Sequence, residues 1–321
     1  MKALRMLAGA AALALLPALG LAQAYPTKPV RIIAPFAAGT GPDANARELA
    51  VELTRLLGQT VYVDNKPGAS GIIGTEAAAK AAPDGYTLYI GTTSTLSTVP
   101  YLYAKLPFNA EKDFIPVSLL GALNTGLVAN PKLPAKNASE LLALLKKDPQ
   151  SVNVATQGIG SYSHLSGLWF ASATGAQLTF VPYNSSSPYG DLVGGQVQLM
   201  FDGLPAATGN IHSGKLKLLA ITGAKRHPAF PDTPTFAELG IKDYTPVAWQ
   251  GLLAPAGTPK AVIDRLAAAM KQVPANAELA KRWTDYGGEL VCDSPAEFAA
   301  FIRNDRAMWG KIIQKAGVRL D

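Results

Sequence analysis

The sequence contains a single cysteine, Cys292, among its 321 residues. One thiol cannot form a disulfide within the chain, and it cannot supply a site made of several thiolates. The chain also has only three histidines, His164, His212 and His227, which are far apart and lack the spacing of a metal-binding helix. These absences exclude a disulfide-stapled scaffold, and we expect neither a metal nor a cofactor.

Long apolar runs are also scarce, because no stretch of 18 or more apolar residues occurs after the first two dozen residues. Residues 1–24 combine a basic start, an uncharged Ala- and Leu-rich run and a final Ala-Gln-Ala with small residues where a signal peptidase cuts. This pattern predicts a cleaved signal peptide, a soluble mature chain that begins at Tyr25, and a location in the periplasm.

Charge of one sign does not dominate the sequence. Lys and Arg number 29 against 23 Asp and Glu, and the formal charge of +6 falls to +4 once Lys2 and Arg5 leave with the signal peptide. The basic residues are spread along the chain, so we expect no nucleic-acid partner. A mildly positive field would suit small anions, although ordinary surface variation gives the same balance.

The chain does contain an alternation of short β-branched runs and longer segments with helical spacing, which is typical of βαβ units. Strands are expected at 30–35, 61–63, 86–90, 117–128, 152–155, 178–181, 198–201, 216–222 and 247–254. Helices are expected at 43–57, 72–81, 137–147, 161–173, 258–270 and 294–316. The pattern predicts an α/β protein whose sheets are largely parallel.

About 297 residues follow the predicted signal peptide, which is long for one hydrophobic core and sufficient for two. We expect a discontinuous first lobe, made of residues 25–124 and 247–321, and a second lobe over 125–246. The two C-terminal helices are assigned to the first lobe because no strand follows them. The chain then crosses between the lobes twice, and two crossings can act as a hinge.

A glycine-rich loop, Gly39-Thr40-Gly41-Pro42-Asp43-Ala44, separates the first predicted strand from the first predicted helix. With Asp64 twenty residues beyond Ala44, this loop imitates a dinucleotide-binding fingerprint. We disfavour that interpretation, because nicotinamide cofactors are not normally available to an exported protein. The alternatives are a loop whose N–H groups face an anion at the helix start, and a loop that needs glycine only to turn.

The second lobe has a matching loop over 156–164, again between a strand and a helix. Its small residues and hydroxyls would let an oxyanion approach the backbone. Ser161 or Ser163 with His164 would instead make a serine-dependent hydrolase. The nucleophile-elbow motif is absent, however, and adjacent side chains on a helix do not face each other. A serine N-cap beside a partly buried histidine is the plainer alternative.

Two further loops, 182–189 and 201–203, follow the next predicted strands. Ligands of open α/β sheets bind beyond the carboxyl ends of the strands, so these loops should line the same cleft. Their hydroxyls and aromatic rings suit a small polar molecule, although a serine-rich turn would look similar. Asp43 and Asp202 would form a carboxylate pair only if the lobes brought them together. Trp249 falls in the predicted crossing and is the one tryptophan considered for ligand contact.

Several motifs occur in a fixed order along the chain. They include Pro35-Phe36-x-x-Gly39-x-x-x-Asp43, Asn65-Lys66-Pro67-Gly68-Ala69, Pro83-Asp84-Gly85-Tyr86, Gly160-Ser161-x-Ser163-His164, Val181-Pro182-Tyr183 and Ala254-Pro255-Ala256-Gly257-Thr258-Pro259. Together they resemble the Bug family of extracytoplasmic solute receptors, the binding components of tripartite tricarboxylate transporters. The chain departs from the family pattern at Gly39-Thr40, usually a double glycine, and at Asn184-Ser185, commonly lysine-glycine.

The resemblance implies a two-lobed periplasmic binding protein of type II topology, with two crossover strands. Such a protein is not an enzyme; it binds a small carboxylate and passes it to membrane permease subunits. The ligand would be a di- or tricarboxylate, an acidic amino acid or an aromatic acid. The implied ligand-binding residues are Phe36, Gly39, Thr40, Asp43, Thr92, Thr93, Ser94, Thr156, Gly158, Ser161, His164, Tyr183, Ser185, Ser186 and Asp202. We also expect a monomer. A structural adhesin, which would bind no small ligand, is a further alternative.

Overall fold

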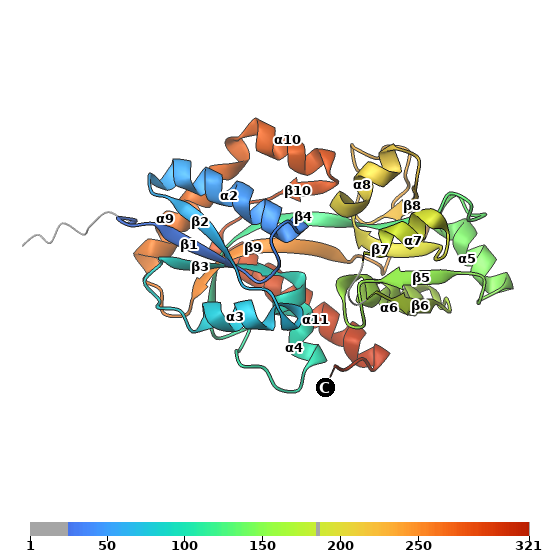
Figure 1. Cartoon of the computed structure of the whole chain (residues 1–321), viewed down its shortest axis with the longest axis horizontal. Helices are drawn as coiled ribbons and strands as arrows, with labels where there is room; N and C mark the ends of the chain where they lie inside the picture. The colour runs from blue at the N-terminus through green and yellow to red at the C-terminus, as the bar shows by residue number, and fades with distance from the viewer. Residues whose placement is uncertain (1–24, 184–186, 321) are drawn as a thin grey trace, which may run out of the picture.

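The structure, a computed structural model, describes residues 25–183 and 187–320. The predicted signal peptide and the candidate residues Ser185 and Ser186 therefore lie outside the described residues. Figure 1 shows two groups of strands and helices side by side, joined by two long strands that run through the middle. Each group has its own hydrophobic core, which agrees with the predicted two-lobed α/β architecture.

The first lobe is built on three parallel strands, β1 (Val30–Ala34), β2 (Val61–Asn65) and β3 (Thr87–Thr92). The crossing strand β9 (Val247–Pro255) lies antiparallel beside β3. The helices of this lobe are α2 (Gly41–Leu57), α3 (Ile72–Ala79), α4 (Val99–Leu102), α9 (Lys260–Met270) and α10 (Ala277–Asp285). Buried Leu49 and Leu53 of α2 pack against buried Ile32 of β1, because helical spacing places these leucines on one face.

The second lobe repeats this plan. Its parallel strands are β5 (Asn153–Thr156), β6 (Thr179–Pro182) and β7 (Leu199–Gly203), and the crossing strand β4 (Phe114–Ala129) lies antiparallel beside β7. Strand β8 (Lys217–Ile221) also pairs with β4. The helices are α5 (Ala138–Lys147), α6 (Tyr162–Thr174), α7 (Tyr189–Gly194) and α8 (Leu204–His212). In both lobes, a strand arriving from the other lobe is inserted next to the third parallel strand.

Strands β4 and β9 form the connection between the lobes. They pair in antiparallel register from Phe114 with Pro255 to Asn124 with Val247. Strand β4 then continues into the second sheet, where Thr125 lies opposite Gly203. The strand order is β2-β1-β3-β9-β4-β7-β5-β6, so the two crossing strands lie at its centre. These are the two crossover strands that the sequence predicts.

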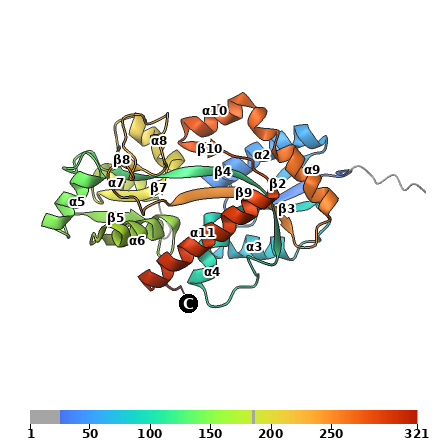
Figure 2. The same ribbon diagram turned by 180° about the vertical axis from the view of Figure 1, so that it is seen from behind.

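The final helix, α11 (Pro295–Ala316), differs from the prediction that it packs on the first lobe alone. Phe298 and Ile302 belong to a core cluster that includes Trp249, whereas Trp309 and Ile313 belong to the core of the second lobe. These four residues are spaced by four and seven positions, so they share one helix face. Figure 2 shows α11 running obliquely across the back of the molecule toward α6. A 22-residue helix is long enough to reach both lobes.

The predicted strands and helices listed above differ from the observed ones by at most three residues at either end. The elements without a prediction are short. They include η3 (Thr93–Thr98), a π-helix directly after β3, the 3₁₀ turns η2 (Ala69–Gly71) and η4 (Val273–Ala275), and β10 (Gly288–Leu290), which pairs with β4. Within the described ranges, no helix is both long and apolar enough to span a bilayer.

Candidate functional site

A cleft of about 950 Å³ lies where the two lobes face each other. Six of the predicted ligand-binding residues line it: Phe36, Thr40, Thr92, Thr93, Ser94 and Asp202. Near its start, α2 contributes four lining residues, Gly41, Pro42, Ala44 and Asn45. The crossing strand β9 contributes Ala248, Trp249 and Gln250. The second lobe adds Gln157, Tyr162, Ser187, Pro188, Tyr189, Gly203, Pro205 and Ala206. Residues from both lobes are thus brought to one space.

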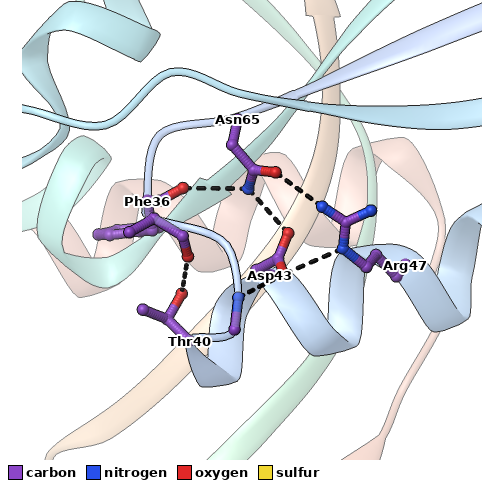
Figure 3. Close-up of polar contacts among 7 residues, drawn as sticks. Phe36, Thr40, Asp43, Arg47 and Asn65 are labelled. Atoms are coloured by element: carbon purple, nitrogen blue, oxygen red, sulfur yellow. Dashed lines mark hydrogen bonds and ion pairs between the residues drawn. The ribbon is translucent and has the colours of Figure 1, made fainter.

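The loop between β1 and α2 is held in shape by Asp43, which is only 2% exposed (Figure 3). Its Oδ2 accepts hydrogen bonds from the Gly39 N–H at 2.9 Å and from Arg47 Nε at 3.0 Å. Its Oδ1 accepts from Asn65 Nδ2 at 2.7 Å, and Asn65 Nδ2 also donates to the carbonyl of Phe36 at 3.1 Å. Asp43 therefore holds the loop in shape by these hydrogen bonds, and it does not line the cleft.

These contacts also fix the charge of Asp43. Burial alone would raise the pKa of this carboxyl, but the hydrogen bonds from Arg47, Asn65 and Gly39 outweigh burial and lower it below its ordinary value. Asp43 is consequently ionised at neutral pH. Its charge is paired with Arg47, so the loop presents no free carboxylate to the cleft.

The start of α2 opens into the cleft without a side-chain cap. Thr40 occupies the N-cap position, but its side chain accepts no hydrogen bond from the helix; its Oγ1 donates to the Ala37 carbonyl at 2.8 Å instead. Pro42, in the first turn, has no N–H to satisfy. The first N–H groups of a helix lack intrahelical partners and carry partial positive charge. This corner can therefore receive an anion.

Thr92 and Thr93 lie at the end of β3 and connect it to the crossing strand. Thr93 Oγ1 accepts from the Trp249 N–H at 2.9 Å and donates to the Val247 carbonyl at 3.3 Å. Thr92 Oγ1 accepts from the Thr95 N–H at 3.4 Å and so caps η3. The Thr93 hydroxyl thus ties the first lobe to β9, and the Thr92 hydroxyl holds the start of η3.

On the second lobe, the cleft contains Asp202, which is 8% exposed. Its Oδ1 accepts from the Gly203 N–H at 2.8 Å, and its Oδ2 accepts from Tyr189 OH at 3.0 Å and from Gln157 Nε2 at 3.4 Å. Burial raises the pKa of Asp202 to about 6, and the hydrogen bonds from Tyr189 and Gly203 only partly offset this effect. No Lys or Arg pairs with this carboxylate among the described residues.

Seven predicted site residues do not line the cleft: Gly39, Asp43, Thr156, Gly158, Ser161, His164 and Tyr183. Thr156 is fully buried. Tyr183 donates its hydroxyl to Asp191 Oδ2 at 2.6 Å on the exposed side of α7. The loop at 156–164 supplies only Gln157 and Tyr162 to the cleft lining, so most of the second-lobe lining residues come from other segments.

Ser161 and His164 are engaged with their own loop. Ser161 is the N-cap of α6: its Oγ accepts from the His164 N–H at 3.3 Å and donates to the Gly158 carbonyl at 2.6 Å. The Nδ1 atom of His164 accepts from the Gly160 N–H at 3.1 Å, and burial lowers the pKa of the imidazole. Neither Ser161 nor Ser163 is hydrogen-bonded to the imidazole within the described chain. This geometry does not support a nucleophile–base pair.

The sequence interpretation expected the loop 201–203 at the cleft but missed Pro205 and Ala206, which follow it at the start of α8 and also line the cleft. A detectable signal was present, because proline near the first helical position directly after a strand marks a helix start. Tyr189, the last residue of the predicted loop 182–189, is the first residue of α7 and lines the cleft as expected. Tyr286, at the end of α10, had no local signal because α10 reaches the cleft only through tertiary packing.

Other candidate groups have structural contacts. Trp249 lines the cleft but is only 1% exposed, and its Nε1 donates to Asp305 Oδ2 at 2.7 Å. Cys292 is buried, and burial raises the pKa of its thiol to about 12. Across residues 25–183 and 187–320, no three His, Cys, Asp or Glu side chains are grouped so that they could hold a metal ion.

Comparison with known proteins gives consistent matches over nearly the whole chain. A family model described as the tripartite tricarboxylate transporter family receptor matches residues 45–318. Protein BugT of Bordetella pertussis (strain Tohama I) is 35% identical over 301 residues, which are 93% of this chain and 92% of BugT.

Solved structures agree with these matches. The periplasmic binding protein BugD has a TM-score of 0.79 and 37% identity, over 92% of this chain and 99% of that one. Rpa4515 from R. palustris, solved with adipate, has a TM-score of 0.83 and 31% identity over 92% and 99% of the two chains. MatC (Rpa3494) from Rhodopseudomonas palustris, solved with bound malate, has a TM-score of 0.79 and 32% identity over 90% and 100%.

Proposed function

Because this chain belongs to the tripartite tricarboxylate transporter family of receptors, which are periplasmic solute-binding proteins, we propose that it captures a small carboxylate between its lobes. We further propose that it delivers this ligand to the membrane permease subunits of such a transporter. The proposal includes no catalytic step, and the serine hydrolase alternative has no support in the contacts of Ser161 and His164.

One observation carries the proposal: the uncapped start of α2 opens into a cleft lined by both lobes. Backbone N–H groups at a helix start favour a carboxylate. The loop is already rigid, because Asp43 and Asn65 tie it down, so little ordering is needed when a ligand binds. The adipate and malate complexes of similar proteins support a carboxylate ligand.

The two lobes would close on the ligand by rotation about β4 and β9. We propose the lobe boundaries expected from the sequence, residues 25–124 with 247–321 and residues 125–246. Besides β4 and β9, helix α11 forms a third link between the lobes, because its C-terminal half packs on the second lobe. Closure is favoured by a ligand that reaches donors on both lobes only in the closed form. The ligand-binding role of the lining residues, the monomeric state and export to the periplasm belong to the same proposal.

Replacement of Thr40 by Asp tests the carboxylate corner. Asp is a preferred N-cap residue, so Thr40→Asp should keep the stability of α2 while placing a negative charge where the ligand carboxylate would lie. We expect affinity for every bound carboxylate to fall by at least about 100-fold, measured by calorimetry against a panel that includes malate and adipate. The matched control is Thr40→Ser, which keeps a hydroxyl and should bind within about threefold of the native chain.

Two results would contradict the proposal. The first is the absence of saturable binding to any carboxylate of the panel. The second is unchanged affinity in Thr40→Asp, which would place the carboxylate elsewhere. Delivery is tested separately, by measuring uptake of the bound carboxylate in cells that carry the permease subunits with and without this chain. Uptake that does not depend on the chain would refute the delivery step alone.

A further inference from the structure

The cleft has an asymmetry of charge. Among the described residues that line it, Asp202 is the only one that is charged at neutral pH, and none is Lys, Arg or His. The described chain has many ion pairs, but their cations, such as Arg47 with Asp43, lie outside the lining. An anion-binding cleft whose one charged side chain is negative limits what its ligand can carry.

The start of α8 has a protein carboxylate directly beside it. The Asp202 carboxylate accepts from the N–H of Gly203, the N-cap residue; it does not cap the first turn of α8, but it places a negative charge next to the helix start on the second-lobe side of the cleft. The start of α2, on the first lobe, has no unpaired carboxylate beside it in the described chain, because Asp43 in its first turn does not line the cleft and is paired with Arg47. The carboxylate of a ligand is therefore favoured at α2 and opposed at α8.

From this arrangement, and resting on the proposed carboxylate-binding function, we infer that the ligand is a zwitterion: a carboxylate at the start of α2 and an ammonium group, at the other end of the molecule, against Asp202. A second ligand carboxylate at that end would face a like charge at a buried site. An ammonium group would supply the cation that Asp202 lacks and would lower the pKa that burial raises.

The surroundings of Asp202 suit an ammonium group. Tyr189 contacts Asp202, and three further aromatic residues, Tyr162, Trp249 and Tyr286, line the same cleft; aromatic faces attract cations. Tyr189 OH and Gln157 Nε2 hold the Asp202 carboxylate in place, so its direction is fixed before a ligand arrives. Gln250, 4% exposed in the cleft wall, has a side-chain oxygen without a hydrogen-bond partner among the described residues. This oxygen is a further acceptor for a donor-bearing ligand.

The test compares ligands that differ only at one end. Calorimetry on the native mature chain would measure 4-aminobutyrate against succinate and 6-aminohexanoate against adipate, with 6-hydroxyhexanoate as a neutral donor. We expect at least one amino acid to bind about tenfold or more tightly than the dicarboxylate of equal length, with the hydroxy acid between them. Replacement of Asp202 by Asn should remove this preference, because it removes the charge and keeps an acceptor.

Asp191→Asn is the matched control, since it removes one exposed carboxylate of the same lobe that does not line the cleft. It should leave the preference unchanged. Tighter binding of the dicarboxylates to the native chain, with or without uptake of a proton, overturns the inference and leaves the carboxylate-binding function standing. An unchanged preference in a folded Asp202→Asn variant overturns it too. If no member of either series binds but another carboxylate of the panel does, the inference alone fails; if no carboxylate of the panel binds, both proposals fail. The native-chain comparison decides the matter even if the variant does not fold.

Discussion

Two buried aspartates, Asp43 in the first lobe and Asp202 in the second, have opposite environments. Asp43 is paired with Arg47 and accepts from Asn65 and Gly39, and its pKa is lowered. Asp202 has only uncharged donors, and its pKa is raised to about 6. The first shapes a loop from behind and leaves a helix start open to the cleft. The second lies in the cleft and accepts from the Gly203 N–H, directly before the first turn of α8, which it does not cap. Similar strand-to-helix corners thus make one side of the cleft receptive to anions and the other side anionic.

The largest expected effect comes from removing the carboxylate of Asp43. Asp43→Ala leaves the Gly39 N–H, Arg47 and Asn65 without their shared acceptor, so we expect the free energy of unfolding to fall by about 3 kcal/mol. Carboxylate affinity should also fall at least about tenfold, because the loop before α2 loses its shape. Urea unfolding and calorimetry measure the two effects. Asp43→Asn keeps one acceptor oxygen and should lose less. Native-like stability and affinity in Asp43→Ala would show that the loop does not depend on this contact.

A second prediction uses pH to separate Asp43 from Asp202. The pKa of Asp202 and that of a third aspartate, Asp305, are both raised to about 6 from an ordinary value of 3.8. Between these pH values the folded chain therefore binds more protons than the unfolded chain. Stability from these groups is therefore greatest at low pH and falls as pH rises from about 4 to about 6, by about 2 kcal/mol for each group.

Asp43 acts in the opposite direction, because its lowered pKa means that its contribution is lost as pH falls below the ordinary value. Urea unfolding at a series of pH values would measure both trends. Asp202→Asn should flatten the dependence between pH 4 and 6, whereas Asp43→Asn should flatten only the acid side. Equal slopes in Asp202→Asn and in the native chain would refute the environment assigned to Asp202.

The smallest expected effect is at the second-lobe corner that does not line the cleft. Ser161→Ala removes the N-cap of α6 and should reduce the free energy of unfolding by about 1 kcal/mol. Carboxylate affinity should change less than about threefold, because Ser161 contacts only its own loop. Thermal unfolding and calorimetry provide the measurements. A loss of affinity as large as that of Asp43→Ala would remove the distinction between the two corners.

The sequence was sufficient for the alternation of strands and helices, because local signals mark their ends. Asn137 and Ser294 both cap their helices as the capping pattern predicts. Gly58, just past α2, has φ 74°, a conformation that favours glycine. The packing of α11 on both lobes was not predictable in this way, since the apolar face that contains Phe298 and Trp309 does not specify which core it meets.

The site was predictable to a similar degree. Asp202 was expected in the cleft because ligands bind beyond strand ends, and Thr40 and Thr92 because the family resemblance implies them; all three line the cleft. The direction of a side chain was not predictable. Asp43 turns toward Asn65, a residue 22 positions away whose neighbourhood exists only in the fold. The loop around Ser161 is likewise closed on itself by hydrogen bonds that its composition does not reveal.

The most direct test of the account is a crystal structure of this chain with a bound carboxylate from the calorimetric panel. We predict one carboxylate oxygen within hydrogen-bonding distance of the N–H groups in the first turn of α2, near Gly41, with the rest of the ligand directed toward Asp202. A ligand carboxylate bound at α8, or a ligand outside the space between the lobes, would contradict it.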